Sequence, residues 1–312
     1  MRHRIFCMAL LFALATPLSA GAAESNRFVS REDVVSIVSE TDSANGSSVA
    51  LGLLFRLVRD WHIYWMNPGD AGAPPELALT RPDQKAGPFA WPAPDWLIAN
   101  SFGDYVVSGT ALLPFAVKLS RPAGPGGIDL RGDAHWLVCS AAICVPQEAS
   151  FALHLPTHRQ HPSVAAPLFA AARVAEPVPA NFETRVTPAG TLIVTGKSFA
   201  AKRVRRAHFF PAQGDAIVNA APQPIAFGAD GFSLDLKLRR QFSAMTLVGV
   251  LEITDTGGVT RAFAITAPFS PDRLGSAGAR PIAFDPPQVD CAAPPQGKSL
   301  DLAGCRQAGL ER

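Results

Sequence analysis

The sequence carries almost no net charge. Its 28 Lys and Arg residues stand against 26 Asp and Glu residues, a formal charge of +2. If an N-terminal segment containing Arg2 and Arg4 is removed, 26 basic residues remain against the 26 acidic ones. A chain this close to neutrality has no general attraction for nucleic acid or anionic lipid, so we expect neither as a partner.

Long apolar runs are missing after the N-terminus, where no segment approaches the roughly 20 residues that a membrane-spanning helix needs. At the start, Arg2 and Arg4 precede an apolar stretch from Ile5 to Leu18, and small residues follow from Ser19 to Ala23. This order is typical of a secretory signal peptide. We expect residues 1–23 to be this signal, and the mature chain to be exported, soluble and not inserted in a membrane.

Cysteine is scarce, with five residues in the chain. Cys7 lies in the expected signal peptide, which leaves four, an even number suited to an oxidising compartment. Other pairings are possible, but proximity pairs Cys139 with Cys144 and Cys291 with Cys305. The sequence has no Cys-x-x-Cys motif of the kind found in thioredoxin folds, and its Asp, His and Ser residues show no arrangement typical of a hydrolase.

Two-residue periodicity dominates the first half of the chain. From Val49 to Val58 the side chains alternate between two faces, which predicts a half-buried strand. Shorter runs of this kind cover 112–119, 136–139 and 150–155. Pro- and Gly-rich stretches such as Asn67–Pro75 separate the runs. Many short strands with this punctuation are typical of an antiparallel β-sandwich, which we place at residues 24–157.

The second half repeats this pattern after a break. Residues 158–180 form a predicted linker, with a short Ala-rich helix at 165–175 followed by two prolines. Residues 181–270 are predicted to form a second β-sandwich. Its expected strands are 192–195, 232–238, 247–253 and 259–265, the last two joined by a hairpin turn at 255–258. Residues 271–312 are Pro- and Gly-rich and read as a loosely ordered tail. The expected fold class is therefore all-β, with two sandwiches.

The pair Cys139 and Cys144 flanks a turn of four residues, 140–143. Cysteines this close across a turn can meet disulfide geometry. On the chain-entropy model, closing a six-residue loop contributes about 2 kcal/mol, against about 3 for the fifteen-residue loop between Cys291 and Cys305. The shorter bridge is a weak structural support, which favours thiol–disulfide exchange, although a structural bridge remains an alternative. Cys291 and Cys305 are most simply a structural disulfide, with a second redox pair or a metal-binding tail as alternatives.

The region around Cys139 and Cys144 can also be interpreted as a metal site. Cys139, Cys144, His135 and Met66 could together hold Cu(I), which prefers soft ligands. His135 is also the nearest group that could lower a thiol pKa, opposed by Glu148, although a strand-surface position explains it more simply. Four neighbouring aromatic residues could line a pocket beside the cysteines or merely pack a sandwich edge. They are Trp61, His62, Tyr64 and Trp65.

Several segments together resemble a known family. The segments His135–Glu148, Trp61–Gly72 and Trp91–Pro94 resemble the periplasmic N-terminal region of the DsbD/ScsB membrane thiol–disulfide reductases. The stretch from Phe209 to Gln223, with Gly249–Leu251, looks like the second periplasmic domain of the ScsB branch. The resemblance covers most of residues 30–270.

This resemblance implies an immunoglobulin-like domain that carries electrons in the periplasm without an organic cofactor. A membrane reductase and a thioredoxin-like domain would reduce its disulfide, and the dithiol would then reduce thioredoxin-fold clients. Cys139 and Cys144 would be the exchanging pair, with Cys144 forming the mixed disulfide. The family shields this disulfide with an aromatic cap loop, which would fall at 100–105 and make Phe102 or Tyr105 the shield.

The sequence departs from the family in two respects. Full-length members continue into a transmembrane unit and a thioredoxin-like domain, whereas this sequence ends at Arg312, so we expect both partners to be separate proteins. Some relatives also have a longer turn between the two cysteines. Two other functions stay open: a partner-binding module with a structural bridge, and copper handling, because the ScsB branch is linked to copper tolerance.

Overall fold

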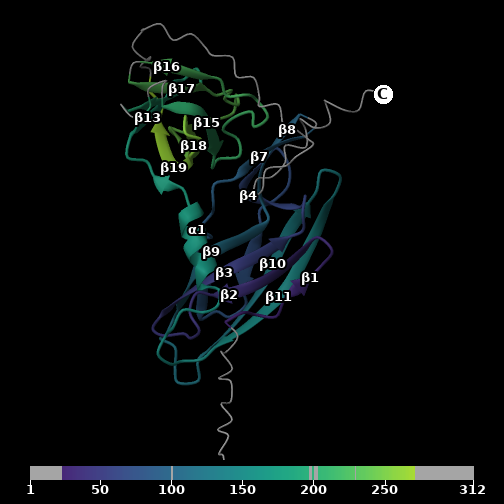
Figure 1. Ribbon diagram of the computed structural model, residues 1–312. Helices are drawn as coiled ribbons and strands as arrows, with labels where there is room; N and C mark the ends of the chain where they lie inside the picture. The colour runs from purple at the N-terminus through teal and green to yellow at the C-terminus, as the bar shows by residue number, and fades with distance from the viewer. Residues whose placement is uncertain (1–22, 100, 197–198, 200–202, 229, 271–312) are drawn as a thin grey trace, which may run out of the picture.

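The computed structural model describes residues 23–99, 101–196, 199, 203–228 and 230–270 (Figure 1). Nearly all of the expected signal peptide lies outside these residues, as does the predicted tail with Cys291 and Cys305. Within the described residues the chain is built almost entirely from strands, which confirms the predicted all-β fold. None of the described helices is long and apolar enough to cross a membrane.

The first domain is a sandwich of two antiparallel sheets. One sheet has five strands in the order β1 (Phe28–Val29), β2 (Asp33–Ser39), β3 (Ser48–Leu57), β9 (Thr110–Leu119), β6 (Gln84–Ala86). The other has six strands, in the order β11 (Cys144–Leu155), β10 (Ile128–Cys139), β4 (His62–Gly69), β8 (Phe102–Ser108), β7 (Asp95–Ala99), with β5 (Glu76–Leu79) also paired to β10.

The core of this domain lies between the two sheets. The alternation predicted from Val49 onward is realised in β3, where Leu51, Leu53 and Phe55 are fully buried. They pack with inward-facing residues of the other sheet, among them Trp65 and Trp136. The period of two thus decides which side chains of each strand enter the core and which remain outside it.

The second domain is a smaller sandwich of two four-stranded sheets. The first has the order β12 (Val178–Pro179), β19 (Thr260–Pro268), β18 (Thr246–Asp255), β15 (Val204–Pro211). The second has the order β13 (Glu183–Val186), β14 (Thr191–Thr195), β17 (Gly231–Asp235), β16 (Ile225–Gly228). The turn predicted at 255–258 joins β18 to β19.

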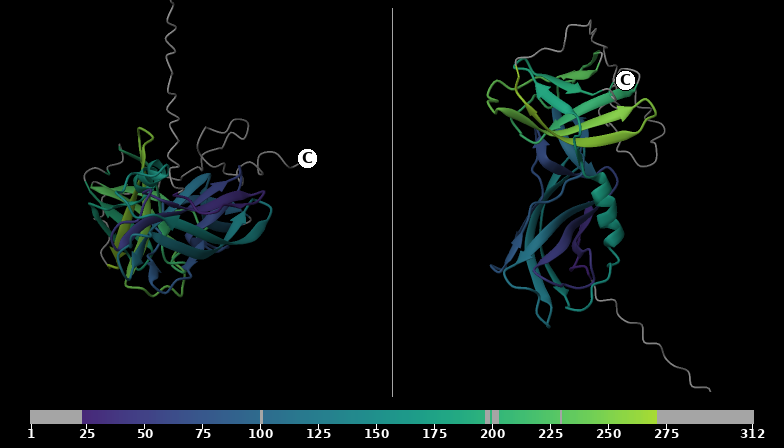
Figure 2. Two further views of the ribbon diagram at one scale, coloured as in Figure 1. Left: turned by 90° about the horizontal axis from the view of Figure 1, so that it is seen from below. Right: turned by 90° about the vertical axis from the view of Figure 1, so that its left-hand side faces the viewer.

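A helix connects the two domains. It is α1 (Ala166–Ala175), which has a proline in its first turn and Glu176 as its C-cap. Its Phe169 is buried against Val38, Leu54 and Leu112, on the side of the five-stranded sheet that faces away from the core. Figure 2 shows α1 along the flank of the first sandwich, leading to the second. The helix therefore packs on the first domain as well as joining it to the second.

The Pro- and Gly-rich stretch Asn67–Pro75 separates two strands as predicted, but it begins later than expected, because β4 extends into it as far as Gly69 and β5 follows at Glu76. The pairing of β4 with β8 shifts register between Tyr64 and Gly69, which takes up the interruption. Asn67 is buried there and donates a hydrogen bond to the carbonyl of Pro211, a contact across the domain boundary that the sequence pattern does not report.

Candidate functional site

The cysteine pair closes the hairpin formed by β10 and β11. These strands pair over their whole length, and Cys139 opposite Cys144 is the last pair before the turn. The two cysteines form a disulfide, with their Cα atoms 4.1 Å apart. The amide of Ser140 donates to the carbonyl of Ile143, and the Ser140 hydroxyl accepts hydrogen bonds from the amides of Ala142 and Ile143. The serine therefore fixes the turn that brings the cysteines together.

The two cysteines differ sharply in exposure. Cys139 is 1% exposed, whereas Cys144 is exposed. The cause is the position of each strand in the sheet. Cys139 lies on β10 and has Cys144 on one side and His62 of β4 on the other. Cys144 begins β11, which pairs with β10 alone among the described strands. An attacking sulfur from outside would therefore reach Cys144 first.

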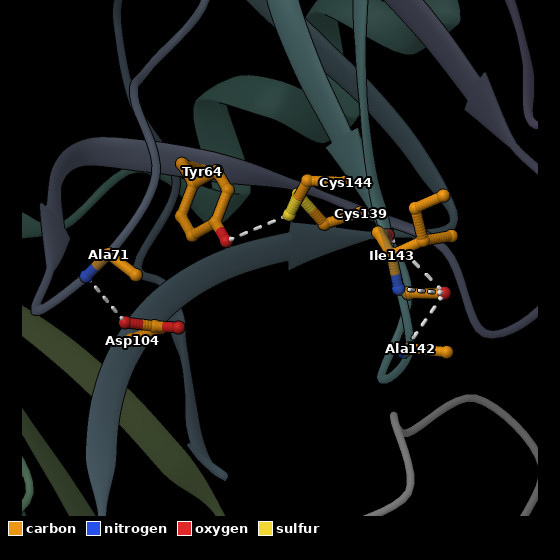
Figure 3. Close-up of a disulfide and its surroundings, with 8 residues drawn as sticks. Tyr64, Ala71, Asp104, Cys139, Ala142, Ile143 and Cys144 are labelled. Carbon is orange, nitrogen blue, oxygen red and sulfur yellow. Dashed lines mark hydrogen bonds between the residues drawn. A yellow bond between two sulfur atoms is a disulfide. The ribbon is translucent and has the colours of Figure 1, made fainter. Parts of the chain in front are cut away.

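Tyr64 covers the inner side of the disulfide. Its hydroxyl lies 3.7 Å from the Sγ atom of Cys144 (Figure 3). The residue is 3% exposed and packs with Val106 and Cys139. On β4 the neighbours of Tyr64 point into the sandwich core, so alternation leaves Tyr64 facing the sulfurs. Burial, aided by the nearby charge of Asp104, raises the pKa of Tyr64 to about 12. The phenol stays protonated at neutral pH and can donate to sulfur.

Two further titratable groups near the disulfide, His62 and Asp104, provide no positive charge. Burial lowers the pKa of His62 to about 4, so its imidazole is neutral at pH 7. Burial also raises the pKa of Asp104 to about 6. The charge of Asp70 adds to this rise, while a hydrogen bond from the Ala71 amide, 3.0 Å long, opposes it. The local field therefore does little to favour a thiolate, apart from the hydroxyl of Tyr64.

One of the residues considered as metal ligands, His135, lies apart from the cysteines. His135 sits four residues before Cys139 on β10, roughly 13 Å along the strand. Its Nδ1 atom lies 3.6 Å from the Oε2 atom of Glu148, and both side chains are exposed. Met66 is 41% exposed on β4, two residues beyond Tyr64. The structure does not gather His135 with the two sulfurs into one ligand set.

The two cap candidates lie on opposite faces of β8. Val106 faces the disulfide, and Phe102, four residues before it, shares its face by alternation. Phe102 is 50% exposed. Tyr105 is fully buried on the other face, where its hydroxyl donates to the Oδ1 atom of Asn219 and its ring packs against Phe210. Of the two, Phe102 is therefore the residue positioned on the side of the disulfide.

The four aromatic residues near the start of β4 also divide between the two faces of the sheet. They are Trp61, His62, Tyr64 and Trp65. Trp65 is a core residue whose indole donates to the carbonyl of Pro92, and Trp61 packs at the edge of the core. Only His62 and Tyr64 adjoin the cysteines, the first through pairing with Cys139 and the second through its hydroxyl. Because His62 and Tyr64 are two residues apart, the sequence could have placed them on the same face of β4. It does not show which face of the strand lies next to the disulfide.

The second domain reaches the strands beside this site, a feature that sequence reasoning missed. Arg239 forms an ion pair with Asp70, and the side-chain amide of Asn219 donates to the same carboxylate. The other Asp70 oxygen accepts a hydrogen bond from the amide of Gly103. Asp70 therefore links the second domain to the start of β8, next to the side chains that cover the disulfide.

Comparison with known proteins identifies the first domain. Residues 26–156 match the family described as "Thiol:disulfide interchange protein DsbD, N-terminal". Among solved structures, the N-terminal periplasmic domain of ScsB from Proteus mirabilis superposes with a TM-score of 0.62 at 16% identity, covering 80% of this chain and 99% of that one. This likeness shows a shared fold across both domains. A search of curated proteins found no match.

Proposed function

Because residues 26–156 form a DsbD/ScsB-family N-terminal domain, we propose that this chain passes reducing equivalents between thiol–disulfide partners through Cys139 and Cys144. The observation that carries the proposal is the asymmetry of the bridge. One sulfur belongs to a buried residue and the other to an exposed one, at the tip of a hairpin. A bridge with one open end can be attacked in one orientation, which suits transfer rather than a purely structural role.

The exchange proceeds in two displacement steps. A partner thiolate attacks the Sγ atom of Cys144, the bond between Cys144 and Cys139 breaks, and Cys139 leaves as a thiolate that takes up a proton. The partner's second thiol loses its proton and attacks the mixed disulfide, which releases Cys144. Two electrons have then moved, leaving this chain as a dithiol and the partner as a disulfide. With an oxidised client the same steps run in reverse, starting from Cys144.

Tyr64 and Phe102 would assist in different ways. The Tyr64 hydroxyl lies close enough to Cys144 to donate to its thiolate when the mixed disulfide is resolved, and again when that thiolate attacks a client. Phe102, exposed on the same face, is the proposed shield that limits attack by small thiols. A docked partner would have to displace Phe102, while Tyr64 would remain in place beneath the sulfurs.

The proposed setting is the periplasm. The structural match is to a periplasmic domain, and residues 1–23 have the order of charge, apolar stretch and small residues of an export signal. The partners proposed are a membrane thiol–disulfide reductase and thioredoxin-fold proteins.

A covalent trap tests this function. In a background with Cys291→Ser and Cys305→Ser, the variants Cys139→Ser and Cys144→Ser each keep one hairpin thiol. The probe is a thioredoxin with its resolving cysteine replaced and its remaining cysteine activated with thionitrobenzoate. We expect the variant that keeps Cys144 to form the mixed disulfide at least tenfold faster than the variant that keeps Cys139.

The reduction potential of the unaltered bridge gives the second measurement. Structural bridges lie below about −300 mV, whereas exchange-active ones are more oxidising. A potential well below that value, together with equally slow trapping by both variants, would leave a structural bridge in a binding module as the better description.

A further inference from the structure

A cluster of three metal-binding side chains lies at the opposite end of the first domain from the disulfide. Asp42 follows the end of β2, while His158 and His161 lie between the end of β11 and the start of α1. One ligand atom from each residue falls within 4.8 Å of the other two. Because Cys144 is at one end of β11 and this cluster is just beyond the other, the two places are separate.

The backbone of the cluster is held by a dense set of hydrogen bonds. The amide of Asp42 donates to the carbonyl of His161, and the amide of His161 donates to the Oδ1 atom of Asp42. The hydroxyl of Ser43 donates to the carbonyl of His158, and the side-chain amide of Gln160 donates to the carbonyl of Ser43. The backbone positions from which the three side chains extend are therefore fixed by the fold.

The ring of His158 is oriented as in known metal sites. Its Nδ1 atom lies 2.8 Å from the carbonyl oxygen of Arg159, and since a carbonyl can only accept, Nδ1 carries the proton. That leaves the lone pair on Nε2 for a metal, the arrangement in which a backbone carbonyl supports a histidine ligand. The second ring, that of His161, places Nδ1 3.4 Å from the Oδ2 atom of Asp42. Ligands of a tetrahedral cation are separated by about this distance.

We propose that Asp42, His158 and His161 form a binding site for a divalent transition cation of the Zn²⁺ type. Two imidazoles and one carboxylate suit Zn²⁺, whereas Ca²⁺ and Mg²⁺ require oxygen ligands. All three side chains reach solvent, so water would complete the coordination. The bound cation would tie the segment that leads into α1 to the end of β2, and thereby stabilise the attachment of the linker to the first domain.

Titration calorimetry with Zn²⁺ tests the site on the mature chain, with the hairpin disulfide oxidised and Cys291 and Cys305 replaced by serine. We expect one Zn²⁺ per chain, binding at least tenfold weaker in His158→Ala and in His161→Ala, and a rise in the melting temperature with Zn²⁺ that these variants lack. Both histidines are exposed, so the substitutions leave the core intact.

The matched control is His154→Ala. His154 is an exposed histidine paired with Asp129 at 2.8 Å, but it has no third ligand in the described chain within reach of both. Its loss should leave Zn²⁺ affinity unchanged. Zn²⁺ binding that survives in the His158→Ala, His161→Ala double variant, or no saturable binding by the parent chain, would overturn the proposal and leave an ordinary ion pair. Equal affinity for Ca²⁺ would also overturn it.

Discussion

The chain has two tyrosines, and both are buried with their hydroxyls engaged by different partners. Tyr64 presents its hydroxyl to Cys144, while Tyr105 donates to Asn219 of the second domain. Burial raises the pKa of each phenol above its usual value. Both therefore act as neutral donors, and only the first has a sulfur within reach. This makes Tyr105 a natural control for Tyr64.

Replacing Tyr64 with Phe should raise the pKa of the Cys144 thiol by about one unit in the reduced protein. A hydrogen bond to a charged group contributes about 1.5–3 kcal/mol, and one pKa unit corresponds to about 1.4 kcal/mol. The measurement is the pH dependence of the alkylation rate of Cys144, resolved by mass spectrometry. Tyr105→Phe should leave that profile in place, and an equal shift in both variants would argue against a direct contact.

Asp104 should make the chain less stable as the pH rises from about 4 to about 6. Its pKa in the fold is about 6, against an ordinary value of 3.8, so within this window the folded chain binds more protons at this site than the unfolded chain. Above pH 6 the ionised, buried carboxylate costs about 1–3 kcal/mol. Asp104→Asn keeps an oxygen to accept from the Ala71 amide and should be more stable than the parent by that amount.

Urea unfolding at pH 4 and pH 7.5 checks this expectation. The gain in unfolding free energy for Asp104→Asn should be large at pH 7.5 and small at pH 4. Because Asp33 is also a buried carboxyl with a raised pKa, the quantity to compare is the difference between variant and parent at each pH. A difference that does not change with pH would mean that the Asp104 carboxyl titrates normally.

The loop after β4 holds the Tyr64 ring against the disulfide through Gly72. This glycine has φ of +81°, and a Cβ atom there would lie 2.2 Å from the Tyr64 ring. Gly72→Ala should therefore displace the ring from its position beside the sulfurs and change the rate at which dithiothreitol reduces the disulfide several-fold. The rate is followed by quenching and counting free thiols.

Gly46→Ala separates this steric effect from backbone strain. Gly46 has nearly the same φ, +82°, but an added Cβ would meet nothing within 4 Å. Both variants should lose about 1 kcal/mol of stability, because alanine disfavours positive φ, yet only the first should change the reduction rate. Equal rates in the two variants would show that the ring does not limit access to the bridge.

Local patterns predicted the elements well where a strand alternates cleanly. β3 and the hairpin at 255–258 follow directly from period two and from turn residues, as does the turn that joins Cys139 to Cys144. Phe102 and Tyr105 show what alternation along a strand cannot decide. They are an odd number of residues apart, so one strand cannot point both at the disulfide, but parity does not say which one faces it.

Contacts between segments that are far apart in the sequence could not be predicted from it. Asp70 and Arg239 are 169 residues apart and Asp42 is 119 residues from His161, and nothing local in the sequence connects them. The pair His158-x-x-His161 is visible in the sequence, but its significance depends on the third ligand, which only the fold supplies. Likewise nothing local in the sequence indicates that the side chain of Asn67 in β4 donates a hydrogen bond to the carbonyl of Pro211.

At the scale of the whole molecule, the two sandwiches share a packed junction. Phe210 and Val250 of the second domain belong to the core of the first, and the Trp96 ring stacks on His208, with ring centroids 4.4 Å apart. Burial lowers the pKa of His208 to about 3, so it lies there as a neutral ring. Because this junction rests on β7 and β8, the second domain supports the strands that flank the disulfide.

Asn219 is the residue on which this junction most depends. It is fully buried, its side chain bonds both Tyr105 and Asp70, and its carbonyl accepts from the Trp96 indole. Asn219→Ala leaves buried polar groups unpaired and should cost about 1–3 kcal/mol. We expect urea unfolding, followed by far-ultraviolet circular dichroism, to change from one transition to two as the domains uncouple.

The control is Gln213→Ala, which removes a partly buried amide bonded within the second domain to the carbonyl of Thr246 and the amide of Val248. It should destabilise the second domain and still leave a single transition, because the junction is intact. The uncoupled Asn219 variant should also show faster reduction of the Cys139–Cys144 bridge, since Asp70 then loses a partner that holds it against the start of β8. One shared transition in both variants, with an unchanged reduction rate, would mean that the junction neither couples the two domains nor constrains the disulfide.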